Sequence, residues 1–396
     1  MISALSPSQS YRTFQWPEFE WTLLLLALAL ASIGLLMVGS ASMSVADALY
    51  NNPWSIVLKH GAYLVLGLFA SLIIFKIPVA VWQQYSWLLL LASVLLLVLV
   101  LVPGIGRRVN GSQRWIMLGP VSMQVSELTK FLLVIFFADY LSRYHLALKT
   151  SWRGFLPPFA VVGVVALLLL LEPDFGGAVV IACTIVAMMF IAGAKLWQFL
   201  SLMLLGVGAM TLIAVTSPYR MERLVTFLDP WADKFDSGYQ LTQSLIAFGH
   251  GNWFGVGFAN SVQKLFYLPD AHTDFIFSII AEEFGLVGTV IVVSLFAGLV
   301  YRMFKLSRRA NLHNNNFICL ASFGVGFLIS VQALINMGVA AGALPTKGLT
   351  LPFISYGGSS VIMSCLLVAF VLRLHWELLG QAGVTMKPGR VKNERR

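Results

Sequence analysis

The sequence is organised around the stretch Leu268-Pro269-Asp270-Ala271-His272-Thr273-Asp274-Phe275. A proline is followed within five residues by three acidic or imidazole side chains, and a hydrophobic run begins at once. Glu282 and Glu283 lie within that run. Ionisable side chains at or inside a membrane-length helix are costly unless they are paired or hydrated, so this stretch indicates a functional site.

The composition predicts an all-α polytopic membrane protein. Of the 396 residues, 58% are hydrophobic and only 11% are charged, which leaves too little polar surface to cover a soluble fold. No signal peptide is expected, because Pro17, Glu18 and Glu20 precede the first apolar run. Because a span needs about 20 mostly apolar residues, we expect ten transmembrane helices, at 21–42, 56–76, 84–103, 127–142, 155–171, 176–193, 196–216, 274–301, 317–340 and 356–376.

The basic residues predict the orientation of these spans. Ten spans put both ends on one side, and a cytoplasmic N-terminus places 16 of the 26 Lys and Arg residues inside, as the positive-inside rule favours. The net charge of +9 then points to anionic lipid headgroups and not to nucleic acid. The resulting layout has a cytoplasmic arm at 1–20, a membrane domain at 21–377 with a long extracytoplasmic loop at 217–273 between spans seven and eight, and a basic cytoplasmic tail at 378–396.

Polar clusters follow the third span and begin the fourth. The segment 104–116 carries arginines, including Arg114, on the expected outer side. It is interpreted either as an anion site, because guanidinium groups bind phosphate bidentately, or as an interfacial re-entrant turn with Arg114 snorkelling. Glu127 and Lys130 are three residues apart and can pair on one helix face, although Glu127 could equally serve the N-terminal turn.

Three further outer stretches are polar. Asp174, in a short hairpin between spans five and six, is expected to cap the sixth helix. Within the long loop, 238–249 has the apolar spacing of an amphipathic helix that lies against the membrane. The stretch 343–360 brackets a lysine and several hydroxyls with prolines and glycines, and irregular backbone at membrane depth is tolerated where it lines a cavity.

These polar stretches all fall on one side of the expected membrane, whereas a transporter distributes polar groups near the midplane. Together 110–130, 172–177, 238–243, 268–285 and 343–360 resemble the motifs of the SEDS family (shape, elongation, division and sporulation) of membrane glycosyltransferases. The ten-span layout agrees over most of the chain, and 346–350 is most similar to the cell-division members. The most specific matches are Pro269-Asp270-Ala271-His272-Thr273-Asp274-Phe275-Ile276-Phe277 and Pro352-Phe353-Ile354-Ser355-Tyr356-Gly357-Gly358-Ser359-Ser360.

The resemblance implies a peptidoglycan glycosyltransferase that polymerises lipid II, an undecaprenyl-pyrophosphate-linked disaccharide-pentapeptide, at the outer face of the inner membrane during septal cell-wall synthesis. The acceptor's sugar 4-hydroxyl attacks the anomeric carbon of a donor, which needs a base for the proton and positive charge on the departing pyrophosphate. The family's base is the aspartate of the His-Thr-Asp-Phe motif, which is Asp274 here. Asp270 is the rival carboxylate, and the alternative for Asp274 is a helix cap.

The resemblance also suggests roles for other residues. The pyrophosphate would be held by Arg114, Lys130 and Lys347, with Glu127 orienting Lys130. Glu282 follows Asp274 by eight residues, about 12 Å along a helix, so a structural or gating role is expected. A divalent cation could assist, although no carboxylate cluster specifies a metal site. The expected substrate-binding set is Arg114, Glu127, Lys130, Asp174, Gln240, Gln243, His272, Thr273, Lys347, Ser355 and Ser359.

The implied partners are a class B penicillin-binding protein, which is the division transpeptidase, and other divisome membrane proteins. Two other functional classes stay open. A lipid II flippase predicts transport without polymer and essential inward-facing polar groups. A scaffold that recruits the transpeptidase predicts that substitutions of Asp274 leave function intact.

Overall fold

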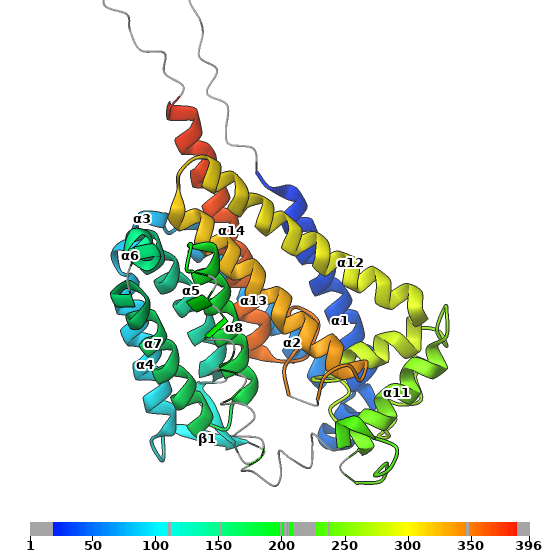
Figure 1. Ribbon diagram of the computed structural model, residues 1–396. Coiled ribbons are helices and arrows are strands. Elements are labelled where there is room, and N and C mark those ends of the chain that lie inside the picture. The colour runs from blue at the N-terminus through cyan, green and yellow to red at the C-terminus, as the bar shows by residue number, and fades with distance from the viewer. Residues whose placement is uncertain are drawn as a thin grey trace, which may run out of the picture.

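The computed structural model describes residues 19–109, 112–119, 121–150, 152–195, 226–236, 238–345 and 348–385, with 197, 198, 200, 201, 204, 206, 208 and 215 between them. Within these residues the chain is a bundle of helices (Figure 1). Five helices are long and apolar enough to cross a membrane. They are α1 (Trp21–Tyr50), α2 (Ser55–Lys76), α12 (Ile276–Leu312), α13 (Asn316–Ala340) and α14 (Gly358–Thr385).

The remaining helices are shorter, and three of them contain shorter apolar stretches, Ser86–Leu101, Leu156–Leu171 and Phe175–Ile191. Every expected span coincides with a helix except 196–216, which falls largely outside the described residues. The expected boundaries were too short for α12, which continues to Leu312 through a segment interpreted as a basic loop. These helices are α3 (Val79–Gln84), α4 (Ser86–Leu101), α5 (Val125–Arg143), α6 (His145–Thr150), α7 (Trp152–Leu171), α8 (Phe175–Ile191) and α11 (Tyr239–Gly251).

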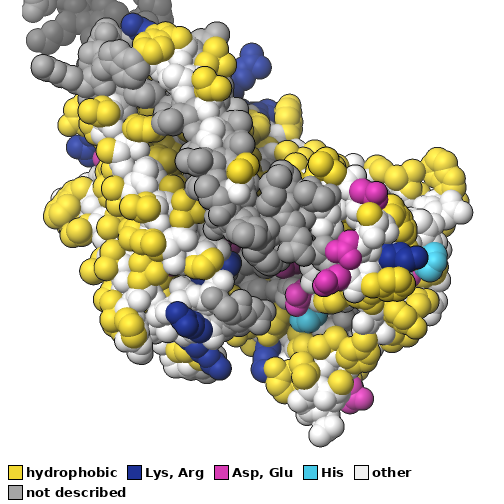
Figure 2. Space-filling view, turned by 60° about the horizontal axis from the view of Figure 1, so that its bottom comes forward, with side chains coloured by type: hydrophobic (Ala, Val, Ile, Leu, Met, Phe, Trp, Pro, Cys, Tyr) yellow, Lys and Arg dark blue, Asp and Glu magenta, His cyan; other side chains and the backbone are white. Residues whose placement is uncertain are grey.

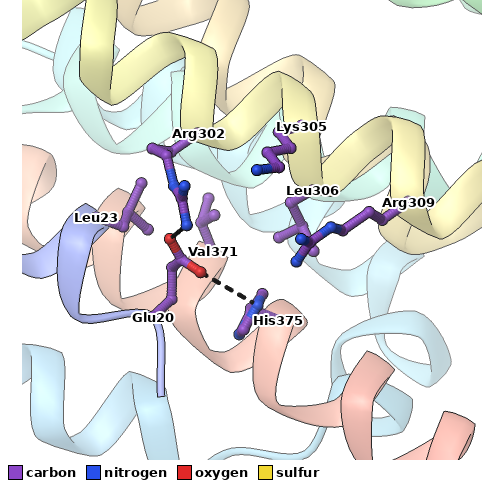
Figure 3. A pocket seen from close by; sticks show the side chains of 8 residues that line it. All are labelled: Glu20, Leu23, Arg302, Lys305, Leu306, Arg309, Val371 and His375. Carbon is purple, nitrogen blue, oxygen red and sulfur yellow. Dashed lines mark hydrogen bonds and ion pairs between the residues drawn. The ribbon is translucent and has the colours of Figure 1, made fainter. Parts of the chain in front are cut away.

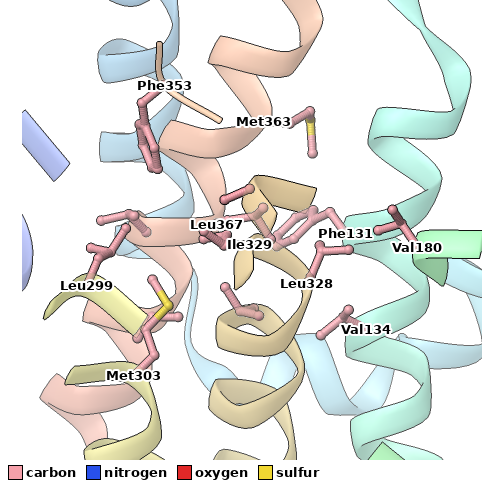
Figure 4. Close-up of a cluster of buried hydrophobic side chains, with 14 of the residues drawn as sticks. Phe131, Val134, Val180, Leu299, Met303, Leu328, Ile329, Phe353, Met363 and Leu367 are labelled. Carbon is pink, nitrogen blue, oxygen red and sulfur yellow. The ribbon is translucent and has the colours of Figure 1, made fainter. Parts of the chain in front are cut away.

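The core is centred on α13, which packs against α5, α8, α12 and α14. In Figure 1, α4–α8 lie on one side of α13, and α1 and α12 lie on the other. Figure 4 shows how buried apolar side chains from these helices meet, including Phe131 of α5, Met303 of α12 and Leu328 of α13. Large apolar side chains on the outer faces of the helices are exposed, as expected of surfaces that contact lipid.

Glycines allow close approach between some of these elements. An added Cβ on Gly34 of α1 would lie 2.3 Å from the carbonyl oxygen of Phe353. Small residues of this kind let backbones pack tightly where lipid gives no hydrophobic drive for helix association. Gly34 therefore holds α1 against the irregular segment that precedes α14.

A three-stranded antiparallel sheet precedes α5 at one end of the bundle (Figure 1). The strands β1 (Gly106–Val109), β2 (Ser112–Leu118) and β3 (Val121–Gln124) pair in sequence order, with Trp115 opposite both Arg107 and Gln124. The re-entrant turn considered for this segment is therefore wrong. The Asn110-Gly111 dipeptide in the sequence is a strong hairpin signal.

The helix α12 is broken at Gly285, whose φ of 63° lies in the left-handed region that favours glycine. The backbone groups released by the break are satisfied by the loop after α11 rather than by the helix. Four bonds of 2.9–3.1 Å make this connection: Val256 N to Glu282 O, Gly257 N to Glu283 O, Leu286 N to Asn252 O and Val287 N to Trp253 O. The loop is thereby tied to the part of α12 that follows Asp274.

We predict that Gly34→Ala destabilises the protein, because the new methyl group overlaps backbone that cannot rotate away. Overpacking of this kind costs about 1–3 kcal/mol and should lower the apparent melting temperature in detergent. The matched control is Gly163→Ala in α7, where nothing lies within 4 Å of the added Cβ. Equal melting temperatures for the two variants would contradict the close approach.

Candidate active site

Asp274 lies in the turn that leads into α12, two residues before the helix begins. The N-cap position is occupied by Phe275, not by Asp274. The half-buried Asp274 carboxylate lies close to Gly348, where an added Cβ would be 2.9 Å from Oδ2. A side chain at position 348 would push the Asp274 carboxylate out of this position, whereas glycine leaves room for it. The turn before α12 and the segment after α13 therefore form one site.

Two amide side chains of α13 hold these segments together. Asn336 Nδ2 donates to the carbonyl oxygens of Asp274 at 2.9 Å and Leu349 at 2.6 Å. One turn earlier, Gln332 Nε2 donates to the carbonyl oxygen of Thr350 at 3.2 Å. Buried carbonyl groups in irregular backbone need such donors, so α13 fixes the backbone on both sides of the Asp274 carboxylate.

The expected pair between Glu127 and Lys130 of α5 is confirmed. Lys130 Nζ lies 2.6 Å from Glu127 Oε1 and 2.8 Å from Gln332 Oε1, and both charged side chains are buried. A buried ion pair persists only with good geometry and further hydrogen bonds, which Gln332 supplies. Because Gln332 and Asn336 lie one turn apart on α13, the same helix contacts the ion pair through Gln332 and the Asp274 backbone through Asn336.

The segment before α14 holds the His272-Thr273-Asp274 backbone from a further direction. Ser355 Oγ donates to the carbonyl oxygen of Thr273 at 2.5 Å, and Tyr356 N donates to that of His272 at 2.9 Å. The His272 and Tyr356 rings lie 5.7 Å apart. Burial lowers the pKa of His272, against the raising effect of Asp270. Ser355 is therefore a positioning group in this structure, and His272 is favoured in its neutral form.

Arg114 of β2 and Asp174 meet at the hairpin between α7 and α8. Asp174 Oδ1 accepts from Gly177 N at 2.9 Å, which confirms the expected cap of α8. Arg114 Nη1 lies 3.7 Å from Asp174 Oδ1, while its other nitrogens donate to the carbonyl oxygens of Glu172 and Pro173. Arg114 thus joins the sheet to the hairpin and keeps a partly exposed guanidinium.

Glu172 was not among the expected site residues. It is fully buried beside Asp174, and neither of its carboxylate oxygens has a hydrogen-bond partner among the residues that the structure describes. Burial, and after it the neighbouring Asp174 carboxylate, raise the pKa of Glu172 to about 8 against the lowering effect of Arg114. The Glu-Pro-Asp sequence showed two carboxylates without a basic neighbour, and that was the available signal.

Gln240 and Gln243 lie on α11, which confirms the helix expected in the long loop. Ser244 of α11 bonds to Ser278 Oγ at 2.5 Å and to the carbonyl oxygen of Ala340 at 2.6 Å. These contacts dock α11 on α12 and α13, with both glutamines half-buried. Ser359 is buried, and its Oγ has no partner within the described ranges. The expected residue Lys347 lies outside the described residues.

Glu282 and Glu283 are both fully buried and point to different partners. The Glu282 carboxylate accepts bonds from Ser261 Oγ and from the backbone N–H groups of Val262 and Gln263. Glu283 Oε1 binds Lys264 Nζ at 2.8 Å and Ser40 Oγ at 2.5 Å. These bonds fasten the loop between α11 and α12 to the bundle and favour a structural role for Glu282.

Charged side chains gather at the end of the bundle that carries the sheet and α11, as Figure 2 shows, while yellow hydrophobic side chains cover the sides. The exposed acidic residues Asp229, Asp233 and Asp236 lie in the segment before α11. In the described part of the chain, no group of three or more His, Cys, Asp or Glu side chains could hold a metal ion.

Known proteins share both the sequence and the fold. The cell cycle protein family of FtsW, RodA and SpoVE matches residues 20–378. A protein of Saccharophagus degradans named probable peptidoglycan glycosyltransferase FtsW is 54% identical over 88% of this chain and 90% of its own. A protein of the same name from Hahella chejuensis is 50% identical over 99% and 98%.

Two solved structures are similar throughout. One, described as structural coordination of polymerization and crosslinking by a peptidoglycan synthase complex, has a TM-score of 0.76 and 30% identity, covering 92% of this chain and 99% of the other. The rod shape determining protein RodA of Thermus thermophilus has a TM-score of 0.68 and 28% identity, covering 91% and 97%. Similarity of this extent agrees with the polytopic helical fold expected from the sequence.

We predict that Glu172 makes stability depend on pH. Its pKa is raised from 4.5 to about 8 on folding, so its stabilising contribution is fully present below about pH 4.5 and is lost as the pH rises through about 8. The apparent melting temperature should therefore fall less between pH 5 and 8 in Glu172→Gln than in the wild type. If the melting temperatures of the two proteins changed with pH in parallel, Glu172 would already be ionised when buried.

Proposed function

This chain belongs to the FtsW/RodA/SpoVE family of cell cycle proteins, and on that premise we propose that it is a peptidoglycan glycosyltransferase that polymerises lipid II with Asp274 as general base. The observation that carries the assignment is that α13 contacts both groups: Asn336 donates to the carbonyl oxygen of Asp274, and Gln332, one turn away, accepts from Lys130, which pairs with Glu127. A base and a cation are thereby held in one rigid frame.

The reaction transfers a glycosyl group between two lipid-linked sugars. The 4-hydroxyl oxygen of the acceptor forms a bond to the anomeric carbon of the donor, and the bond from that carbon to the pyrophosphate oxygen breaks. Asp274 takes the hydroxyl proton, and undecaprenyl pyrophosphate leaves with the electron pair. A positioned base contributes about 10²–10⁴-fold to such a step, and fixed positive charge stabilises the leaving group.

Asp274 fits the role of base better than Asp270. Asp274 is half-buried, and its backbone is held by Asn336. Asp270 is exposed on the loop side of the turn, at a φ of 53°. Its carbonyl oxygen accepts from Thr273 N and thereby closes the turn. Asp270 therefore shapes the turn, while the Asp274 carboxylate faces the Gly348 segment.

The pyrophosphate is assigned to Arg114, Lys130 and Lys347, with Glu127 orienting Lys130. Arg114 supports this role with a partly exposed guanidinium whose nearest carboxylate oxygen is 3.7 Å away, longer than a charge-assisted hydrogen bond. Lys130 is fully buried, so it acts on the leaving group from within the protein. The acceptor side is assigned to Gln240, Gln243 and His272, on α11 and in the turn before α12.

The polymer is made at the outer face of the cytoplasmic membrane, at the division septum, with both chain ends in the cytoplasm. This orientation is supported by the position of the sheet and α11 at the end of the bundle opposite the start of α1 and the end of α14 (Figure 1). The proposed partners are a class B penicillin-binding protein and other divisome membrane proteins. A solved relative described as a peptidoglycan synthase complex that coordinates polymerization and crosslinking supports the first of these.

We predict that Asp274→Asn lowers lipid II polymerisation by about 10²–10⁴-fold, because asparagine keeps the size but cannot take a proton. Polymer is measured with purified protein and its cognate transpeptidase, with melting temperature as the folding check. Asp270→Asn is the matched control and should keep most of the activity. Equal polymer from wild type and Asp274→Asn would remove Asp274 from the chemistry, and lipid II transport without polymer from either would indicate a flippase.

We predict that Lys130 acts through its charge and not only through packing. Lys130→Met leaves Glu127 buried and unpaired, which costs about 3–5 kcal/mol, so both stability and polymerisation should fall. Adding Glu127→Gln removes the unpaired charge and should restore the melting temperature but not the polymerisation rate, at low or saturating lipid II. Recovery of activity in the double variant would assign the pair a purely structural role.

A further inference from the structure

A second polar site lies at the end of the bundle where α1 begins and α14 ends, opposite the candidate active site (Figure 1). It is a small pocket between the start of α1, the last turns of α12 and the middle of α14. Figure 3 shows Arg302, Lys305 and Arg309 reaching from α12 toward Glu20 and His375. The basic residues are spaced three and four apart, so they share one face of α12.

The charges of this pocket do not balance. Glu20 is the one carboxylate in its lining, and it pairs with Arg302 through Oε1 and with His375 Nε2 through Oε2 at 3.4 Å. Lys305 and Arg309 have no carboxylate within ion-pair distance among the residues that the structure describes. Two cations therefore face the pocket in excess of the internal anion.

The Glu20 carboxylate shows what kind of ligand suits the pocket. Its two oxygens are held by different helices, one by a guanidinium and one by an imidazole. A phosphate group offers the same arrangement of oxygens, and arginine binds it in the same way. Lys305, which is half-buried, and Arg309, which is exposed, remain available to a second oxyanion at the mouth.

The aromatic residues beside the pocket indicate that it lies at the level of the lipid headgroups. Trp21 and Tyr301, which adjoin Glu20 and Arg302 in sequence, are 62% and 63% exposed, and exposed Trp and Tyr at helix ends mark the headgroup region. The apolar side chains Leu23, Leu306 and Val371 complete the lining. Basic pockets between transmembrane helices at this level bind the headgroups of anionic lipids.

We propose that this pocket binds the phosphate of an anionic phospholipid of the leaflet on the side of the chain termini. The phosphate oxygens contact Lys305 and Arg309, while Arg302 stays paired with Glu20. This function goes beyond glycosyl transfer, since the site lies at the opposite end of α12 from Asp274 and needs no lipid II.

The test compares binding of phosphatidylglycerol and phosphatidylcholine with the same acyl chains. Delipidated full-length protein in uncharged detergent is titrated with each lipid, and bound lipid is counted by native mass spectrometry. Arg309→Gln and Lys305→Gln should each weaken phosphatidylglycerol binding by roughly fivefold. Arg308→Gln is the matched control, because Arg308 is the exposed neighbour of Arg309, carries the same charge and does not line the pocket.

The expected result is tighter retention of phosphatidylglycerol than of phosphatidylcholine, lost in the two pocket variants and kept in the control, with melting temperatures unchanged. Equal retention of the two lipids, or equal weakening by Arg308→Gln and Arg309→Gln, would overturn the proposal. Displacement of phosphatidylglycerol by millimolar inorganic phosphate would also overturn it, because the pocket would then be a site for soluble anions.

Discussion

The candidate site depends on the hydrogen bonds that two amide side chains of α13 donate to irregular backbone. Gln332 and Asn336 donate to the carbonyl oxygens of Asp274, Leu349 and Thr350. Because buried carbonyl groups need hydrogen-bond donors, loss of either amide would leave part of this backbone unsatisfied. Gln332 also accepts a hydrogen bond from Lys130. Loss of Gln332 would therefore disturb both the backbone at Thr350 and the buried pair of Lys130 and Glu127.

The turn at Asp274 and the region of Glu282 and Glu283 are stabilised by different kinds of hydrogen bond. Around Asp274 the backbone carbonyl oxygens of the turn accept hydrogen bonds from the side chains of Asn336 and Ser355. Farther along α12 the carboxylates themselves make the stabilising contacts. Ser261 donates to Glu282, and Lys264 and Ser40 donate to Glu283. Glu282 and Glu283 therefore hold the loop between α11 and α12 to the bundle, a short distance along the chain from Asp274, the proposed base.

Most of the fold could be predicted from the sequence, because long apolar runs in a membrane protein leave helices as the main choice. The pairing of Glu127 with Lys130, the cap at Asp174 and the helix at 239–251 followed from local spacing. The sheet was missed because its strands are short and the segment 104–116, which contains the hairpin signal at 110–111, was interpreted as an anion site or a re-entrant turn. Contacts between distant segments, such as Asn336 with Asp274 or Lys264 with Glu283, depend on packing that no local pattern encodes.

The helix α12 connects the two polar ends of the molecule, yet it does not act as one rod. It begins beside Asp274 and ends beside the pocket of Arg302, Lys305 and Arg309, but it is broken at Gly285. Its N-terminal part (here the outer part) is fixed by the loop after α11, and its C-terminal part (the inner part), named after the proposed orientation, is fixed by Glu20 before α1. Two distant sites are coupled only through a structural element that has two conformations, when ligands at both sites shift the equilibrium between those conformations. A lipid bound to the inner part could therefore influence Asp274 only through a change at the break, where the bonds of residues 252–257 and the buried carboxylates of Glu282 and Glu283 hold the outer part in place.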